Sequence, residues 1–134
     1  MPVKYLLDTH TWIWMHAAPE ELSPACVRLF GGLKGRDELL LSSISLWELC
    51  KLVEKRRVTL REDLEAWVRS ALDVPRLRVV PLDFLVFHRS TTLPPPFHAD
   101  PADQMIVATA RLNDATIVTR DALLRNYPHV RTLW

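Results

Sequence analysis

The chain has 134 residues, a length typical of one domain and sufficient to bury a hydrophobic core. Hydrophobic residues make up 49% and charged residues 25%, which excludes a disordered or fibrous chain. The formal net charge of +1 excludes binding of nucleic acid through an overall basic surface, so a polyanionic partner would need a local basic patch. We expect a single domain over residues 1–134.

Cysteine use and hydropathy predict a cytoplasmic protein. Cys26 and Cys50 lie in unrelated apolar contexts and match no zinc-binding spacing, so we expect both to be buried free thiols in a reducing compartment. No apolar run reaches the length of a membrane span, and the N-terminus lacks the apolar region of a signal peptide. Contact with a membrane is therefore not expected.

The predicted elements alternate between short strands and helices along the whole chain. Apolar runs predict strands at residues 3–8, 39–41, 77–82, 116–119 and 130–133. Helical patterns predict helices at residues 11–17, 24–31, 43–55, 61–72 and 102–112, with short helices after Asp83 and Asp121. The proline-rich segment 93–99 predicts a stiff loop. This alternation favours a three-layer α/β domain with a mostly parallel sheet of four to five strands.

The predicted helix 43–55 is apolar apart from one main polar stripe. Ser45, Glu48, Lys51 and Lys55 recur at steps of three or four residues and therefore share a face. This pattern places Glu48 among bulky core residues.

The chain has five tryptophans, which is many for its length. We expect Trp47 and Trp67 to lie in the core. Trp12 and Trp14 are two positions apart on one predicted helix and cannot share a face, so we expect at least one of them to meet a partner chain.

Four acids are expected at one edge of the sheet. Asp8 and Asp121 each follow an apolar strand, and ligands bind at the carboxyl ends of parallel strands. Asp103 lies at the start of a helix that begins on the same side, and Glu48 follows another strand closely. Carboxylates gathered there would repel one another unless a hard divalent cation such as Mg²⁺ or Mn²⁺ binds between them.

Each acid also has a purely structural explanation. Asp8 and Asp121 stand where helices take N-caps, and Asp103 stands in a first turn, where the helix dipole favours a carboxylate. Glu48 can pair with Lys51 on the same helix face. Hydroxyls accompany three of the acids, and Thr9, Ser45 and Thr119 serve either to orient carboxylates or as ordinary caps and strand residues.

Four motifs carry a resemblance to a known family. They are Leu-Leu-Asp-Thr-His at 6–10, Ile-Ser-Leu-Trp-Glu-Leu at 44–49, His-Ala-Asp-Pro-Ala-Asp-Gln-Met-Ile-Val-Ala-Thr-Ala at 98–110, and Ile-Val-Thr-Arg-Asp at 117–121. In this order they resemble PIN-domain ribonucleases, and most closely the VapC toxins of bacterial toxin–antitoxin pairs. The similarity spans essentially the whole chain.

The resemblance implies a PIN-like fold and a Mg²⁺-dependent endoribonuclease, with Mn²⁺ as the alternative ion. It implies that the catalytic and metal-binding positions are Asp8, Glu48, Asp103 and Asp121. It assigns Asp100 a secondary site role, whereas Gln104 stands where many relatives carry arginine, which leaves the charge partner of Asp103 open. It also implies a homodimer and a VapB-type antitoxin that wraps the toxin and blocks its site.

RNA binding would depend on local cations. Lys51 and Lys55 share the stripe of Glu48, and Arg120 stands next to Asp121, so these three side chains are candidates for phosphate contacts. Solvated charge at helix ends is the alternative for each of them. Two histidines, His10 and His98, lie near acids, although histidines at helix starts and in loops commonly have no role in a site.

Two other functions compete with the nuclease. A phosphoaspartate enzyme or receiver domain also carries acids at strand ends, but it leaves Glu48 and Asp103 unexplained, and a dehalogenase-like motif would need an acid where the chain has His10. A catalytically silent PIN-like module that binds protein or RNA is the second alternative. Its expected mark is the loss of an acid, and the chain retains all four.

Overall fold

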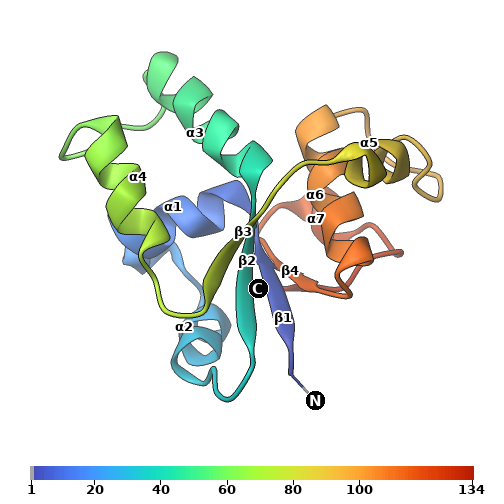
Figure 1. Ribbon diagram of the computed structural model, residues 1–134, viewed down its shortest axis with the longest axis horizontal. Coiled ribbons are helices and arrows are strands. Elements are labelled where there is room, and N and C mark those ends of the chain that lie inside the picture. The colour runs from blue at the N-terminus through green and yellow to red at the C-terminus, as the bar shows by residue number, and fades with distance from the viewer. Residues whose placement is uncertain (1) are drawn as a thin grey trace.

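The computed structural model describes residues 2–134 and shows a five-stranded sheet between two layers of helices (Figure 1). The strands are β1 (Lys4–Leu7), β2 (Glu38–Ser42), β3 (Leu77–Val80), β4 (Thr116–Val118) and β5 (Thr132–Leu133). The α-helices are α1 (Thr9–Ala17), α2 (Pro24–Gly31), α3 (Ser43–Glu54), α4 (Leu64–Leu72), α5 (Phe84–Ser90), α6 (Pro101–Leu112) and α7 (Ala122–Arg125). All pairings within the sheet are parallel, in the order β3-β2-β1-β4-β5, which confirms the predicted fold class.

The leucines of β2 show why the sheet needs helices on both sides. Successive side chains of a strand point to opposite faces, so Leu39 and Leu41 face one layer and Leu40 faces the other. Leu41 belongs to the core cluster that contains Trp12 of α1, whereas Leu40 belongs to the cluster that contains Ile106 of α6. A continuous apolar strand of this kind is typical of a parallel sheet that is buried on both faces.

Helix α3 is oriented differently from the prediction. Trp47 and Cys50, both expected to be buried, are exposed, Trp47 by 57%. Ser45, expected on the polar stripe, is fully buried, because its hydroxyl forms a hydrogen bond with Thr9 of α1. The polar stripe therefore begins inside the molecule, and the indole of Trp47 faces outward. Cys26 is buried, as predicted.

The remaining tryptophans divide between the core and a half-buried surface. Trp12 and Trp67 are buried and pack edge to face with ring centroids 5.3 Å apart, which confirms Trp67 as a core residue. Trp14 is half-buried and packs against Trp134 with ring centroids 6.0 Å apart. Contact of Trp12 or Trp14 with a partner chain stays a prediction.

The pairing of β1 with β4 positions the residues that follow these strands. Leu7 stands opposite Val118, and the backbone N–H of Asp8 donates to the carbonyl of Val118 at 3.1 Å. Asp8 and Thr119 therefore leave the sheet next to each other. No helix between Pro2 and Trp134 has the length and apolar character that crossing a membrane requires.

Candidate active site

Asp8 and Asp121 are tied together by a buried threonine at the carboxyl edge of the sheet. The Thr119 hydroxyl donates to Oδ2 of Asp8 at 2.7 Å and accepts a hydrogen bond from the backbone N–H of Asp121 at 3.0 Å. Oδ1 of Asp8 accepts from the backbone N–H of Thr9 at 2.8 Å. A single fully buried hydroxyl thus connects the two strand-end acids.

Glu48 is held from the opposite side by α1. The Thr9 hydroxyl donates to Oε1 of Glu48 at 2.6 Å and lies 2.8 Å from the Ser45 hydroxyl. A threonine hydroxyl carries one proton, so Ser45 must be the donor to Thr9 in this chain of hydrogen bonds. The first residue of α1 therefore fixes the carboxylate of α3. The alternative pairing of Glu48 with Lys51 is wrong, because Lys51 forms its salt bridge with Glu54 at 2.6 Å.

Asp100 and Asp103 enter the site from the start of α6. Oδ1 of Asp100 accepts from the backbone N–H groups of Ala102 and Asp103, at 2.9 and 3.2 Å, and so caps the helix. Oδ2 of Asp103 lies 2.7 Å from Nε2 of His98 in the preceding loop. Gln104 donates from Nε2 to the backbone carbonyl of His98 at 3.2 Å. The partner of Asp103 is thus a histidine, and Gln104 holds the loop that carries it.

Sequence reasoning gave His98 no firm role. The segment 93–99 has no helical or strand period, so no pattern indicated which way its side chains point. The nearness of a histidine to the acids of α6 was the one available sign. His10, by contrast, is exposed at the start of α1.

The electrostatic environment shows that these carboxylates lie within reach of one another. The pKa of Glu48 is raised to about 7, mainly by burial, with the charges of Asp8, Asp103 and Asp100 contributing to the rise. Burial likewise raises the pKa of Asp103 to about 6, against the lowering effect of the His98 hydrogen bond. The pKa of Asp8 is also raised, again mainly by burial, and the charge of Asp121 adds to the effect. We refer to Asp8, Glu48, Asp100, Asp103 and Asp121 together as the acidic edge.

The acidic edge lacks basic partners that would neutralise it. Within residues 2–134, no lysine or arginine forms a salt bridge with a member of the acidic edge, and His98 is the one ion-pair partner found there. No three His, Cys, Asp or Glu side chains of the described chain already converge as a set of metal ligands. Asp8, Glu48 and Asp103 are partly buried, whereas Asp100 and Asp121 are exposed. Together they form a group of neighbouring carboxylates, which is the donor chemistry that suits a hard divalent cation.

Three members of the acidic edge also cap helices. Asp8, Asp100 and Asp121 are each the N-cap of a helix, as the structural explanation required. Oδ1 of Asp121, for example, accepts from the backbone N–H of Leu123 at 2.8 Å. A cap uses one carboxylate oxygen, so capping alone leaves the other oxygen of each group available.

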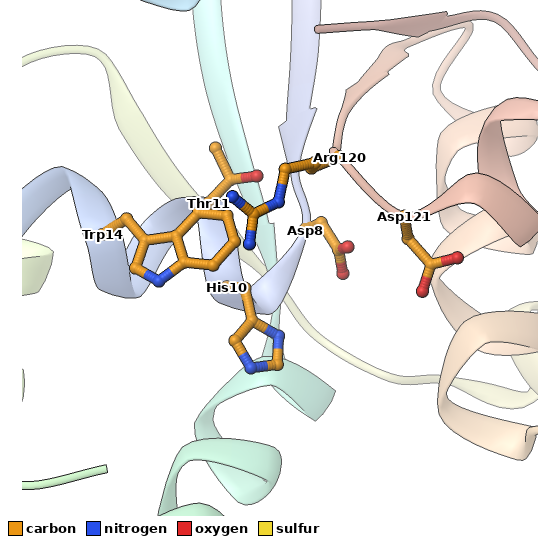
Figure 2. A pocket seen from close by; sticks show the side chains of 6 residues that line it. All are labelled: Asp8, His10, Thr11, Trp14, Arg120 and Asp121. Carbon is orange, nitrogen blue, oxygen red and sulfur yellow. The ribbon is translucent and has the colours of Figure 1, made fainter. Parts of the chain in front are cut away.

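Two hollows border the acidic edge. The smaller, of about 250 Å³, is lined by Asp8, Asp121, His10, Thr11, Trp14 and Arg120. Figure 2 shows Trp14 and Arg120 at one side of this pocket and the carboxylates of Asp8 and Asp121 at the other. The larger, of about 600 Å³, runs between the starts of α3 and α6 and has Glu48 and Asp100 in its wall. The acidic edge therefore separates a polar pocket from a wider groove.

The three predicted phosphate-contact residues have different environments. The guanidinium of Arg120 lies 4.3 Å from the centroid of the Trp14 ring and donates to Glu21 at 3.2 Å, so the side chain is fixed at the rim of the smaller pocket. Lys51 is held by Glu54, as described above. Lys55 is exposed at the end of α3.

The chain is similar in sequence to one known family and to a curated protein. The model of the PIN domain family matches residues 5–130. Ribonuclease VapC22 of Mycobacterium tuberculosis is 34% identical to this chain over 131 residues, which cover 96% of this chain and 97% of that protein.

Several solved structures share the fold of this chain. VapBC2 from Rickettsia felis, bound to a DNA fragment from its promoter, matches with a TM-score of 0.68 and 18% identity over 98% of each chain. A toxin–antitoxin complex from Klebsiella pneumoniae matches with a TM-score of 0.68 and 19% identity over 97% of this chain and 96% of that one. FitAcB from Neisseria gonorrhoeae matches with a TM-score of 0.64 and 23% identity over 97% and 96%.

Proposed function

Because this chain belongs to the PIN-domain family, we propose that it is a metal-dependent endoribonuclease of the VapC type. The observation that carries the proposal is the acidic edge, a group of five carboxylates at the carboxyl end of the sheet, three of them partly buried. No lysine or arginine of residues 2–134 forms a salt bridge with any of them. We propose that residues 1–134 form one domain.

The proposed ligands of the cation are Asp8, Glu48, Asp103 and Asp121. We assign Mg²⁺ as the physiological ion, since an all-oxygen donor set suits it, with Mn²⁺ as the alternative. Thr9 and Thr119 orient the carboxylates to which they donate, and Ser45 supports Thr9. Asp100 starts the helix that carries Asp103 and adds negative charge near Glu48.

The proposed reaction is hydrolysis of an RNA phosphodiester without a protein nucleophile. A bound divalent cation would supply Lewis-acid chemistry, lowering the pKa of a water and offsetting charge on the phosphate. Attack of a water on phosphorus, with loss of a proton from the water and protonation of the departing 3′-oxygen, would leave a 5′-phosphate and a 3′-hydroxyl. The protein contributes the fixed carboxylates and cations nearby. Arg120, at the rim of the pocket that contains Asp8, is positioned to contact a phosphate of the substrate.

The proposed partners are an RNA substrate, a second copy of the chain, and a VapB-type antitoxin that blocks the site. The support is the family and the toxin–antitoxin complexes that share the fold. If a small reading frame adjoins the gene for this chain, co-expression with its product tests the partner: a stable complex with suppressed RNA cleavage is expected. Independent purification of both proteins, with cleavage unaffected by mixing, would contradict it.

Replacing Asp8 with asparagine tests the enzymatic function. The variant retains a cap at α1, because asparagine is also a good N-cap, but it loses a charged ligand. We expect metal-dependent cleavage of single-stranded RNA to fall below detection, measured by gel electrophoresis with and without Mg²⁺. Asp73→Asn, at an exposed aspartate after α4, is the matched control and should cleave like the unaltered protein.

Two results would count against the nuclease. Undiminished cleavage by the Asp8→Asn variant would show that Asp8 is not a ligand of a catalytic metal. RNA that is bound but never cut by the unaltered protein, with any divalent cation, would favour the silent binding module instead.

A further inference from the structure

Trp47 has an exposed indole next to the acidic edge, and packing in the core does not explain its position. Its side chain is 57% exposed, whereas the other four tryptophans are buried or half-buried. The next residue in the chain is Glu48, and both line the larger groove. We propose that Trp47 is a stacking platform for one nucleobase of the RNA substrate, an inference that rests on the proposed function.

The groove beside Trp47 has the chemistry of a base-binding surface. Apart from the acids Glu48 and Asp100, its lining is mainly apolar and includes Ile44, Leu82 and Met105. Flat heteroaromatic bases stack on exposed aromatic side chains, which is how proteins commonly hold unpaired RNA. Since the two acids belong to the acidic edge, a phosphate bound at that edge leaves the base of a neighbouring nucleotide near the indole.

The charges that follow Trp47 along α3 favour RNA over a protein segment as the occupant. Nζ of Lys51, one turn further on, lies 6.0 Å from the centroid of the Trp47 ring, although it shares its charge with Glu54. Net positive charge then comes from Lys55, Arg56 and Arg57, all exposed and without a salt bridge to any residue between Pro2 and Trp134.

These features lie in a line along one helix. From Glu48 to Lys55, α3 rises by about 10 Å, since each residue of an α-helix contributes ~1.5 Å. Figure 1 shows α3 extending from the carboxyl ends of the strands, with α6 on the opposite side of the sheet. Along α3 the order is indole, acid and cations, which suits a single strand that places a base on the indole, a phosphate at the acids and further phosphates on the cations.

Binding of short single-stranded RNAs to Trp47 variants tests the inference independently of cleavage. All proteins carry Asp8→Asn to prevent cutting, and fluorescence anisotropy reports the affinity for labelled oligoadenylate and for an abasic RNA of equal length. Trp47→Phe retains an aromatic face, whereas Trp47→Leu retains apolar bulk without one. We expect Trp47→Leu to lose about tenfold in affinity for oligoadenylate, the usual effect of removing one stacking partner.

The controls distinguish stacking from structure and from protein docking. Trp47→Phe should bind oligoadenylate nearly as well as the parent, and the abasic RNA should not distinguish any of the three proteins. Circular dichroism melts should coincide, because the indole is exposed. Equal binding of oligoadenylate by Trp47→Leu and the parent would overturn the inference, as would a loss confined to binding of the antitoxin.

The inference and the proposed function fail in different ways. If the unaltered chain cuts RNA but Trp47→Leu changes neither binding nor the KM for cleavage, the stacking platform is wrong and the nuclease stands. If no RNA is cut although the Trp47 dependence of binding holds, the nuclease is wrong and the base-binding surface stands.

Discussion

Two buried threonines set the direction of the acidic side chains. Thr9 and Thr119 are 2% and 0% exposed, and each gives its single hydroxyl proton to a carboxylate. A carboxylate that accepts such a bond cannot rotate freely, so both of its oxygens have a defined direction. Preorganisation of this kind is how residues behind a metal ligand influence metal affinity.

Replacement of Thr119 with valine is the test at this scale. Valine has nearly the same shape but cannot donate to Asp8 or accept from the N–H of Asp121. We expect Mg²⁺-dependent cleavage to fall about 10- to 100-fold, as for other residues that support metal ligands. Stability should fall by about 1 kcal/mol because the partly buried N–H of Asp121 loses its acceptor.

Thr119→Ser is the matched control, since it restores the hydroxyl, and it should recover most of the cleavage rate. Isothermal titration with Mg²⁺ and urea denaturation separate the effect on metal affinity from the effect on folding. Full activity in the valine variant would show that Asp8 needs no orientation by Thr119.

At the scale of the element, the start of α6 combines two roles in Asp100. The carboxylate caps the helix through two backbone N–H groups, and Pro101 follows at the first helical position. The same charge raises the pKa of Glu48 and Asp103. Capping needs an oxygen, whereas the electrostatic contribution needs a charge, so substitutions can separate them.

Asp100→Asn and Asp100→Ala should therefore differ. Asparagine preserves the cap, so we expect an unchanged stability and a weaker affinity for Mg²⁺. Alanine removes both functions and should also lower the free energy of unfolding by about 1 kcal/mol. Chemical denaturation and Mg²⁺ titration measure the two effects. Equal loss of stability in both variants would mean that the cap depends on charge, and unchanged Mg²⁺ affinity in both would remove Asp100 from the site.

The elements also show what sequence can and cannot predict. The strand ends at Asp8 and Asp121 were predictable, because an apolar run stops abruptly at an acid and parallel strands end at one edge. The orientation of α3 was not, because most of its faces are apolar and the pattern alone could not exclude Trp47 from the core. The buried position of Ser45 depends on Thr9, which is 36 residues away in the chain. The contact of His98 with Asp103 likewise depends on a loop without a periodic pattern.

At the scale of the whole molecule, the acidic edge exists only when the sheet is assembled. Its members follow the ends of β1 and β4 or lie in the middle of α3 and at the start of α6, and they span residues 8 to 121. In the unfolded chain these carboxylates are solvated and far apart, whereas folding brings them together and partly buries Asp8, Glu48 and Asp103. Folding and ionisation of the acidic edge are therefore coupled. A bound cation would offset the free-energy cost of holding the ionised carboxylates close together.

This coupling predicts how the stability of the metal-free protein depends on pH. The pKa of Glu48 rises from an ordinary value of 4.5 to about 7 on folding, and that of Asp103 from 3.8 to about 6. A carboxyl with a raised pKa in the folded state binds its proton more tightly there, so the stabilisation is complete below the unfolded pKa. It is lost as the pH rises through the folded pKa. We therefore expect the contribution of Glu48 to stability to decrease as the pH rises from about 4.5 to about 7.

Differential scanning fluorimetry with and without Mg²⁺ can measure this decrease. His16 acts in the opposite direction, because burial lowers its pKa, so the comparison of the unaltered chain with Glu48→Gln isolates the carboxyl. In EDTA, Glu48→Gln should gain roughly 5 °C relative to the unaltered chain at about pH 8 and little at about pH 5. Saturating Mg²⁺ should stabilise the unaltered chain increasingly as pH rises, because proton and metal compete for the same oxygens. A Mg²⁺ effect of equal size at both pH values would show that the metal does not bind where these carboxyls ionise.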